Sequence, residues 1–152
     1  MRVLFDTCVA IDILGKTRFI AEAFTAYDLA LFKKMDVCLS VSSTTDIVYL
    51  LHSRGFLSKA GSRDVATRFM RLFTLLDNTA SDCQQAAASA MTDYEDALIA
   101  HTAARHGIDF IITRNVKDFA VSPVPAFSPK KFVELYRPSC IGYEEVSWET
   151  ST

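Results

Sequence analysis

The sequence predicts an α/β protein whose parallel sheet carries helices on both faces. The chain has 152 residues and is 50% hydrophobic, enough for one domain with a substantial core. Short apolar runs typical of buried strands alternate with longer segments of helical periodicity. Strands joined in this way need right-handed crossover connections, which place helices on both sides of a parallel sheet.

The first unit of this alternation is a strand followed by two helices. Residues 3–5 are a short apolar run that ends at Asp6 and predicts a buried strand. A helix is expected over residues 7–14 and stops at Gly15. A second helix is expected over residues 18–35, because apolar side chains recur there near a period of 3.6 residues.

The second unit begins with a predicted strand at residues 37–41. A helix that runs to His52 follows it, and Gly55 ends this segment. Residues 62–76 predict an amphipathic helix with arginines on its polar side. A brief strand is expected around residues 75–78.

The third unit contains the clearest strand of the chain, residues 109–113. Two helices are expected before it. One opens with a capping box at Ser81 and runs to Met91. The other covers residues 92–106 and is closed by Gly107.

The last predicted elements are a short strand and a helix. Residues 124–127 are expected to form an edge strand, because Pro125 argues against a central one. Ser128 and Pro129 are favourable capping and first-turn residues for a helix that runs to Tyr136.

The expected organisation is one domain, residues 1–137, followed by a C-terminal tail, residues 138–152. No apolar run approaches the roughly 20 residues of a membrane-spanning helix, and the first strand leaves no room for a targeting segment. The four cysteines show no C-x-x-C spacing and are interpreted as reduced thiols. These features predict a cytoplasmic protein without a membrane partner.

The overall charge argues mildly against nucleic-acid binding by charge alone. The 16 Lys+Arg and 18 Asp+Glu residues give a net charge of −2, whereas proteins that bind nucleic acid by bulk charge are usually basic. Any such contact must use a metal ion or local basic residues. The basic residues expected near the predicted site are Arg54, Lys59, Arg63, Arg114 and Lys117.

Acidic residues occur where the predicted strands end and where a helix begins. Asp6 follows the first strand, Asp46 follows the second, and Asp118 follows the strand at 109–113. Ligands of parallel sheets bind outside the carboxyl ends of the strands. Asp93 and Asp96 must come from a helix whose start points at that edge.

Several of these acids also have a purely structural interpretation. Asp6 could be a helix N-cap, and Asp46 fits a capping box that starts at Ser43. Glu95 fits a capping box with Thr92, and we interpret Glu95 as structural for that reason.

Asp93 and Asp96 lie three residues apart on one helix face. The helix dipole accounts for Asp93. It accounts less well for Asp96, which begins the face occupied by Ala100, where an unpaired acid is costly. Asp118 could be an ordinary loop residue, and Asn115 could be a turn residue.

Taken together, the acids predict a metal site. Carboxylates that converge without enough basic partners repel each other, which raises their pKa values. A hard divalent cation removes that cost, and oxygen ligands suit Mg²⁺ or Mn²⁺. The chemistry that follows is metal-assisted hydrolysis of a phosphodiester. The predicted metal ligands are Asp6, Asp46, Asp93, Asp96 and Asp118.

Four segments between residues 2 and 136 resemble the PIN domain family. They are Leu4-Phe5-Asp6-Thr7, the acid at Asp46, the run DYEDALIA that starts at Asp93, and the run ITRNVKDF that starts at Ile112. The resemblance implies a three-layer α/β/α sandwich with a central parallel sheet, and Mg²⁺- or Mn²⁺-dependent endoribonuclease activity on an RNA substrate. Many members are toxins of VapC type that a cognate antitoxin protein inhibits.

The resemblance also implies catalytic roles for Asp6, Asp46, Asp96 and Asn115. Asp6 and Asp96 match the first and third acids of the family. Asp46 stands where Glu is usual and is one methylene shorter. Asn115 stands where the fourth acid is often Asp, so we expect weaker metal binding. Cys8 stands where a small polar residue is common.

Neighbouring residues are expected to support this site. Thr113 matches a hydroxyl often found before the fourth acid, and Arg114 lies beside it. Asp118 and Asp93 are the candidates to replace the charge that Asn115 lacks.

Other sites receive less support from the sequence. His101 and His106 do not share a helix face, which argues against zinc, and no Gly-rich nucleotide-binding motif is present. The alternative function is a catalytically weak or inactive PIN-like module that binds a protein partner or RNA. The helices at residues 19–35 and 68–76 are expected to be partly exposed, and the resemblance implies a homodimer.

Overall fold

The structure, a computed structural model, describes residues 1–139 and contains a parallel five-stranded sheet, as predicted. The strands lie in the order β3-β2-β1-β4-β5, and β1 pairs in parallel with both β2 and β4. The edge position of β5 confirms the expectation based on Pro125. The strands are β1 (Arg2–Phe5), β2 (Asp36–Ser40), β3 (Thr74–Leu76), β4 (Phe110–Ile112) and β5 (Ala126–Phe127).

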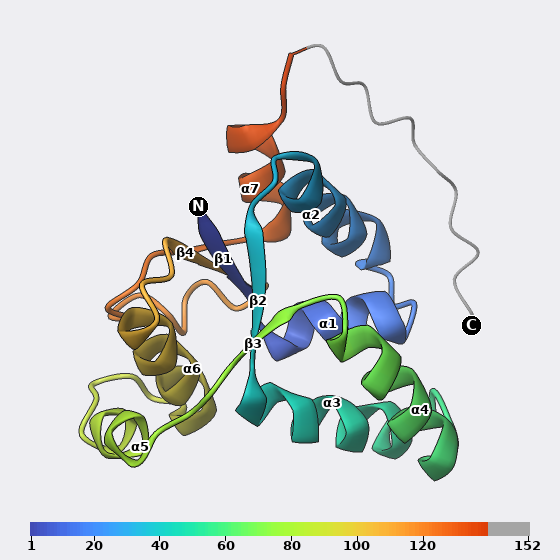
Figure 1. Ribbon diagram of the computed structural model, residues 1–152, viewed down its shortest axis with the longest axis horizontal. Coiled ribbons are helices and arrows are strands. Elements are labelled where there is room, and N and C mark those ends of the chain that lie inside the picture. The colour runs from blue at the N-terminus through green and yellow to red at the C-terminus, as the bar shows by residue number, and fades with distance from the viewer. Residues whose placement is uncertain (140–152) are drawn as a thin grey trace.

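Helices cover both faces of the sheet, which confirms the three-layer α/β/α sandwich. In Figure 1, α5 and α6 lie on one side of the strands, and the remaining helices lie on the other. None of the helices described in residues 1–139 has the length and apolar character needed to cross a membrane. The helices are α1 (Thr7–Leu14), α2 (Ile20–Phe32), α3 (Val41–Ser53), α4 (Lys59–Met70), α5 (Ala80–Ala87), α6 (Tyr94–Arg105) and α7 (Pro129–Tyr136).

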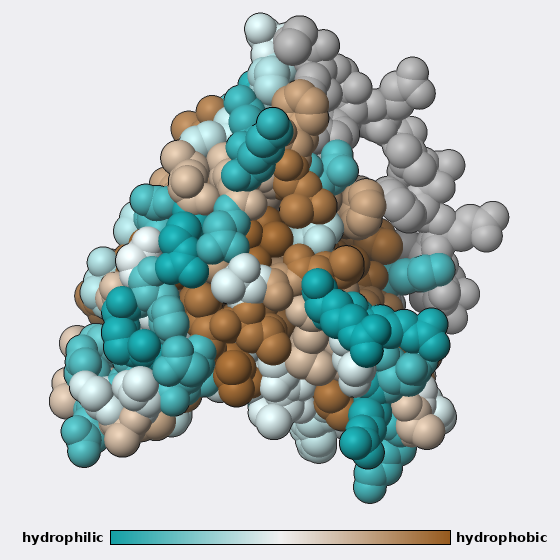
Figure 2. All heavy atoms as spheres, viewed as in Figure 1, coloured by the Kyte–Doolittle hydropathy of each residue, from teal (hydrophilic) through white to brown (hydrophobic). Residues whose placement is uncertain are grey.

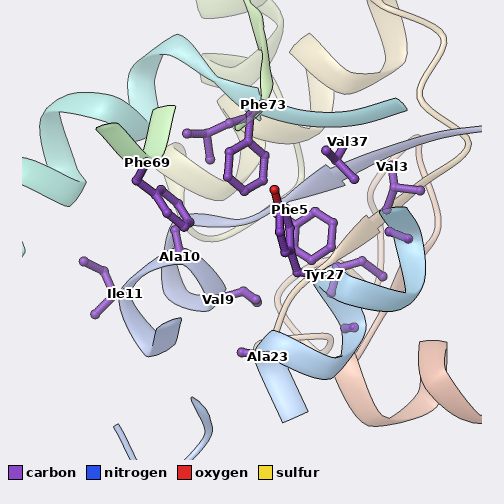
Figure 3. Packing of buried hydrophobic residues seen from close by; sticks show 14 of the residues in the cluster. Val3, Phe5, Val9, Ala10, Ile11, Ala23, Tyr27, Val37, Phe69 and Phe73 are labelled. Carbon is purple, nitrogen blue, oxygen red and sulfur yellow. The ribbon is translucent and has the colours of Figure 1, made fainter. Parts of the chain in front are cut away.

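Alternation along β1 divides the core into two halves. Phe5 points into the larger cluster, where its ring centroid lies 5.9 Å from that of Tyr27 and 6.0 Å from that of Phe73 (Figure 3). Leu4 points to the opposite face and packs with Ile111 in the smaller cluster against α5 and α6. Side chains on both faces are fully buried, which explains why the strand sequence is apolar throughout.

The predicted start of α3 is wrong. The helix begins at Val41, so Ser43 lies inside it and is buried instead of capping it. Two hydroxyl groups explain the difference: Thr44 donates to the Val41 carbonyl and Thr45 donates to the Ser42 carbonyl. These bonds back along the helix are compatible with helical backbone and do not mark its beginning.

The predicted helix over residues 62–76 is displaced toward the N-terminus. Ser58 caps α4 by accepting a hydrogen bond from the Gly61 amide, and the helix ends at Met70. The chain then turns and enters β3, whose pairing with β2 satisfies its backbone. Apolar residues continue at helical spacing through Leu76, so periodicity alone cannot locate this boundary.

The capping box of α5 is real, but it is placed two residues before the predicted one. The Thr79 hydroxyl accepts from the Asp82 amide, and the Asp82 carboxylate accepts from the Thr79 amide at 2.7 Å. The helix is shorter than expected and ends at Ala87. The predicted tail and Cys140 lie outside the described residues, apart from positions 138 and 139, so the domain boundary stays a prediction.

Candidate active site

A pocket of about 200 Å³ lies at the carboxyl ends of β1 and β4. Its wall comes from α1, the end of α3, the start of α6 and the loop after β4. This is the sheet edge where the sequence places the acids. The charged residues that line it are Asp6, Asp93, Glu95, Asp96, Asp118, Arg54 and Arg114, and Asn115 lines it too.

Asp6 is held at the base of this pocket by neighbouring side chains. It occupies the N-cap position of α1, yet within the described residues its side chain makes no capping hydrogen bond. The Thr113 hydroxyl donates to Asp6 Oδ2 at 2.7 Å, and the Cys8 thiol donates to the same oxygen at 3.0 Å. Burial raises the pKa of Asp6, and the hydrogen bonds from Cys8 and Thr113 oppose that rise.

Cys8 serves here as a neutral donor. Burial, together with the adjacent Asp6 charge, raises the pKa of its thiol to about 12. The thiol therefore stays protonated at neutral pH and can donate to Asp6. Its sulfur also accepts a hydrogen bond from the Arg114 amide at 3.4 Å, which connects α1 to the loop after β4.

The start of α6 differs from the capping box predicted with Thr92. Asp93 is the N-cap, and its Oδ1 accepts from the amides of Glu95 at 2.8 Å and Asp96 at 3.1 Å. Glu95 therefore has no capping role, and its carboxylate accepts a hydrogen bond from Thr7 Oγ1 at 3.3 Å in the pocket. The predicted capping box between Thr92 and Glu95 is therefore wrong, and Glu95 lies instead among the residues that line the pocket.

Asp96 is a strongly perturbed carboxyl group at the start of α6. Burial, followed by the charges of Asp6, Asp93 and Asp118, raises its pKa to about 7. Asp118 lines the same pocket as Asp96, although Asp118 itself is exposed. Its carboxylate adds negative charge to a pocket in which Asn115 is neutral.

Asp46 lies farther from the pocket than predicted. Among the described lining residues Asp46 is missing, but it interacts with Glu95. Burial raises the pKa of Asp46, and hydrogen bonding to Glu95 lowers it by less. Burial also raises the pKa of Glu95, and the charges of Asp46 and Asp6 raise it further. Asp46 and Glu95 therefore form an interacting pair of acids beside Asp6 and Asp96.

Two of the expected basic residues reach the pocket. Arg54 and Arg114 line it, whereas Lys59 and Arg63 belong to α4 and Lys117 is exposed in the loop after β4. The Arg114 charge lowers the pKa of Asp6. The lining therefore holds more carboxylates than cations.

The donor set fits a divalent metal in its chemistry. Its carboxylates share one pocket, and their mutual repulsion is the condition that a hard cation relieves. Within residues 1–139, no three His, Cys, Asp or Glu side chains already stand in a metal-binding arrangement. The fit rests on the shared pocket and on the oxygen donors.

Three solved structures illustrate the similarity of this fold to known proteins. VapBC2 from Rickettsia felis, bound to a DNA fragment from its promoter, is 16% identical with a TM-score of 0.68, covering 84% of this chain and 98% of that chain. A toxin–antitoxin complex from Klebsiella pneumoniae is 23% identical with a TM-score of 0.63, covering 84% and 97%. Mycobacterium tuberculosis VapC20, a Sarcin-Ricin loop cleaving toxin, is 18% identical with a TM-score of 0.56, covering 72% and 86%.

The sequence matches a family model but no individual curated protein. A search of curated proteins found no significant match. At the identities given above, the solved structures show a shared fold. The family model described as PIN domain matches residues 2–117, which is more than half of the chain. The chain belongs to the PIN domain family.

Proposed function

We propose that this protein is a metal-dependent endoribonuclease that hydrolyses RNA phosphodiester bonds with Mg²⁺ or Mn²⁺ as cofactor. The observation that carries the proposal is Asp96, a half-buried carboxyl group that shares one pocket with Asp6 and Asp118. Its pKa of about 7 reflects burial and unrelieved repulsion. A site of this kind favours a divalent cation near neutral pH.

Asp6, Asp96 and Asp118 would hold the metal, with Asp93 and Glu95 beside them. The bound ion would supply an activated water and neutralise charge on the phosphoryl group. Asp6 is oriented for this role by its hydrogen bonds from Thr113 and Cys8 (described above).

Asp46 and Asn115 take more distant parts in this proposal. Asp46 acts on the site through Glu95, with which it interacts. Asn115 lines the pocket, and its backbone N–H donates to Thr113 Oγ1 at 3.0 Å. It therefore supports the residue that orients Asp6. Asn115 contributes no charge.

We further propose that the protein is the toxin of a toxin–antitoxin pair. Support comes from the structures that share its fold, because those from Rickettsia felis and Klebsiella pneumoniae are toxin–antitoxin complexes. The partner would be an antitoxin protein. The same proposal places the protein in the cytoplasm, where an RNA substrate is present.

A homodimer is part of this proposal. Exposed apolar residues occur on α2 and beside β3, and Figure 2 shows apolar side chains in the middle of the face that carries these elements. A hydrogen bond from the Tyr27 hydroxyl to the Leu72 carbonyl links α2 to the turn before β3. Apolar residues gathered on one face are typical of an association surface. The exposed residues are Phe24, Leu31, Phe32, Leu72 and Leu75.

The test of catalysis is cleavage of a structured RNA by purified protein with Mn²⁺. The wild type should cleave, and Asp96→Asn should abolish cleavage, because it removes a carboxylate from the pocket without changing the size of the side chain. Asp64→Asn is the matched control, since Asp64 lies in an exposed ion pair with Arg68 on α4. Equal cleavage by both variants would show that the activity does not come from this site.

The alternative is a catalytically weak or inactive module that binds RNA or a protein partner. It is favoured by the neutral Asn115, which stands where the family often has an acid, and by the net charge of −2. Retention of the structured RNA in a gel-shift assay, without cleavage in Mn²⁺ or Mg²⁺, would support this reading and overturn the enzyme proposal.

A further inference from the structure

Asp12 is a buried acid that stands next to the pocket without being among its described lining residues. It lies in the second turn of α1 and is 1% exposed. Burial raises its pKa, and the Thr17 hydroxyl and the Arg114 charge oppose that rise. A carboxylate buried this deeply is costly unless other groups are paired with it. The groups that contact Asp12 therefore indicate the role of this buried carboxylate.

Within residues 1–139, the groups in contact with the Asp12 carboxylate come from Thr17 and Arg114. Thr17 Oγ1 donates to Oδ1 at 2.6 Å. Arg114 Nε lies 2.6 Å from Oδ2 in an ion pair, although the two buried atoms are not aligned for a hydrogen bond. Asp12 thus joins the loop between α1 and α2 to the residue that follows Thr113 at the end of β4.

The same loop supplies an aromatic surface for Arg114. The guanidinium carbon lies 4.7 Å from the centroid of the Phe19 ring, within cation–π range. Phe19 is itself fixed, because its amide donates to Thr17 Oγ1 at 3.2 Å. One hydroxyl group, that of Thr17, therefore connects the Asp12 carboxylate to Phe19, the aromatic neighbour of Arg114.

Arg114 is consequently restrained but still open to the pocket. Asp12 faces its Nε, the Phe19 ring lies within cation–π range of its guanidinium carbon, and its backbone amide donates to Cys8. Its side chain remains 31% exposed and lines the pocket. Restraint of a long side chain before binding reduces the entropy lost when a ligand arrives.

We propose that Asp12 and Phe19 are positioning residues that hold Arg114 ready to bind a phosphate of the RNA strand. The acidic wall of the pocket repels phosphate, and Arg114 provides a fixed cation beside it. A planar guanidinium suits this task because its terminal nitrogens can donate together to a phosphate. This inference rests on the proposed ribonuclease function.

The first test is steady-state cleavage of RNA in Mn²⁺ by Asp12→Asn, which removes the charge and keeps the shape. We expect kcat to fall about tenfold with a smaller change in KM, because orientation is lost. Arg114→Gln should lower kcat about a hundredfold, the range for removing a donor that stabilises developing charge. Asp64→Asn is the control for removing one ion pair.

The decisive comparison is the double variant. If Asp12 acts through Arg114, Asp12→Asn has no further effect on kcat in the Arg114→Gln background. An equal loss in both backgrounds would overturn the proposal and indicate a general structural role. Phe19→Leu should lower kcat severalfold with the Asp12 pair intact, which provides a second variant if Asp12→Asn does not fold.

A second readout does not depend on catalysis. In ¹H–¹⁵N spectra, the Arg114 Nε–H signal should be protected from solvent exchange in the wild type and lose protection in Asp12→Asn. Inorganic phosphate should shift this signal in the wild type only. Absence of cleavage together with these spectra would reject the proposed function but retain the positioning of Arg114. Unchanged spectra in Asp12→Asn would overturn the positioning.

Discussion

At the scale of single residues, burial and neighbouring charge act in the same direction on Asp96. Its pKa rises from an ordinary 3.8 to about 7, so the folded protein retains a proton that the unfolded chain releases. Because the folded state binds more protons over this interval, the free energy of unfolding falls as pH rises from about 4 to about 7. The metal-free site is therefore a source of instability at neutral pH.

Replacing this carboxyl group should stabilise the metal-free protein. Asp96→Asn is expected to raise the free energy of unfolding by about 1 kcal/mol at pH 8, after allowance for solvent screening. For a chain of this length, this corresponds to a rise in melting temperature of about 2–4 °C. The gain should be smaller at pH 5, where the folded wild type is already protonated. Differential scanning calorimetry in EDTA at the two pH values measures it.

Manganese provides the internal check on this result. Millimolar Mn²⁺ should raise the melting temperature of the wild type, because it binds the folded state, and should have little effect on Asp96→Asn. A lower melting temperature for the variant than for the wild type at pH 8 in EDTA would contradict the repulsion argument.

The site residues differ in how far the sequence could predict them. Asp6 directly follows an apolar strand and Asp96 lies in the first turn of a helix, so the sequence could identify both, and both line the pocket. Glu95 could not be separated from a capping residue, because that distinction depends on Asp93, which has the extended backbone of an N-cap. Asp12 carries no sequence signal at all, since its partners Thr17 and Arg114 are brought to it by the fold.

At the scale of elements, the start of α6 depends on one side chain with two possible roles. Asp93 accepts two backbone amides and also lines the pocket. Asp93→Ala should cost about 1 kcal/mol, lowering the melting temperature by about 2–4 °C, because the cap is lost. Asp93→Asn should retain the cap and most of this stability. Thermal unfolding in EDTA at pH 7 compares them, and equal losses would show that capping is not the main contribution.

The contact between α5 and α6 contains a buried acid whose pKa is lowered. Asp82 is fully buried and accepts from Arg105 Nε at 3.0 Å. Burial alone would raise the pKa of Asp82, but hydrogen bonds from Thr79 and Arg105 lower it further than burial raises it. A lowered pKa means that this stability is present above the unfolded value of 3.8 and is lost as pH falls through the folded value.

Asp82→Asn should therefore destabilise the protein at pH 7 by about 1.5–3 kcal/mol, because the charge-assisted hydrogen bond from Arg105 becomes a neutral one while Arg105 keeps its ion pair with Asp77. The difference from the wild type should shrink as pH falls below 3.8, where the unfolded chain takes up the proton first, and disappear below the lower pKa of the folded state. Urea denaturation at pH 7 and pH 3 measures both values. Asp64→Asn, in an exposed pair, should cost less than about 0.5 kcal/mol at either pH. A loss independent of pH would point to packing and not to the ion pair.

Element boundaries were the least predictable feature, for two physical reasons. Thr44 and Thr45 have hydroxyl groups that suit helix starts, yet they bond backward inside α3. The apolar spacing of Phe69, Phe73 and Leu76 fits one long helix, although the chain turns after Met70. Pairing of β3 with β2 decides the second case, and no local pattern contains that information.

At the scale of the whole molecule, the position of the pocket follows from the class of fold. Parallel strands end at one edge, so acids placed after β1 and β4 meet without any local signal for contact. The order of the strands is a different matter. Nothing in the hydrophobic periodicity distinguishes β3-β2-β1-β4-β5 from other orders, because that order depends on which apolar faces the helices cover.

The exposed apolar surface beside β3 leads to a prediction about assembly. Leu72 and Leu75 are 53% and 45% exposed, and charges there would oppose burial against a second copy. Leu72→Glu combined with Leu75→Glu should convert a dimer into a monomer in light scattering coupled to size-exclusion chromatography. Val121→Glu is the control, because Val121 is 62% exposed and lies in the loop between β4 and β5, at the opposite edge of the sheet from β3. A double variant that keeps the wild-type mass, or a wild type that is itself monomeric at high micromolar concentration, would show that this surface does not pair two chains.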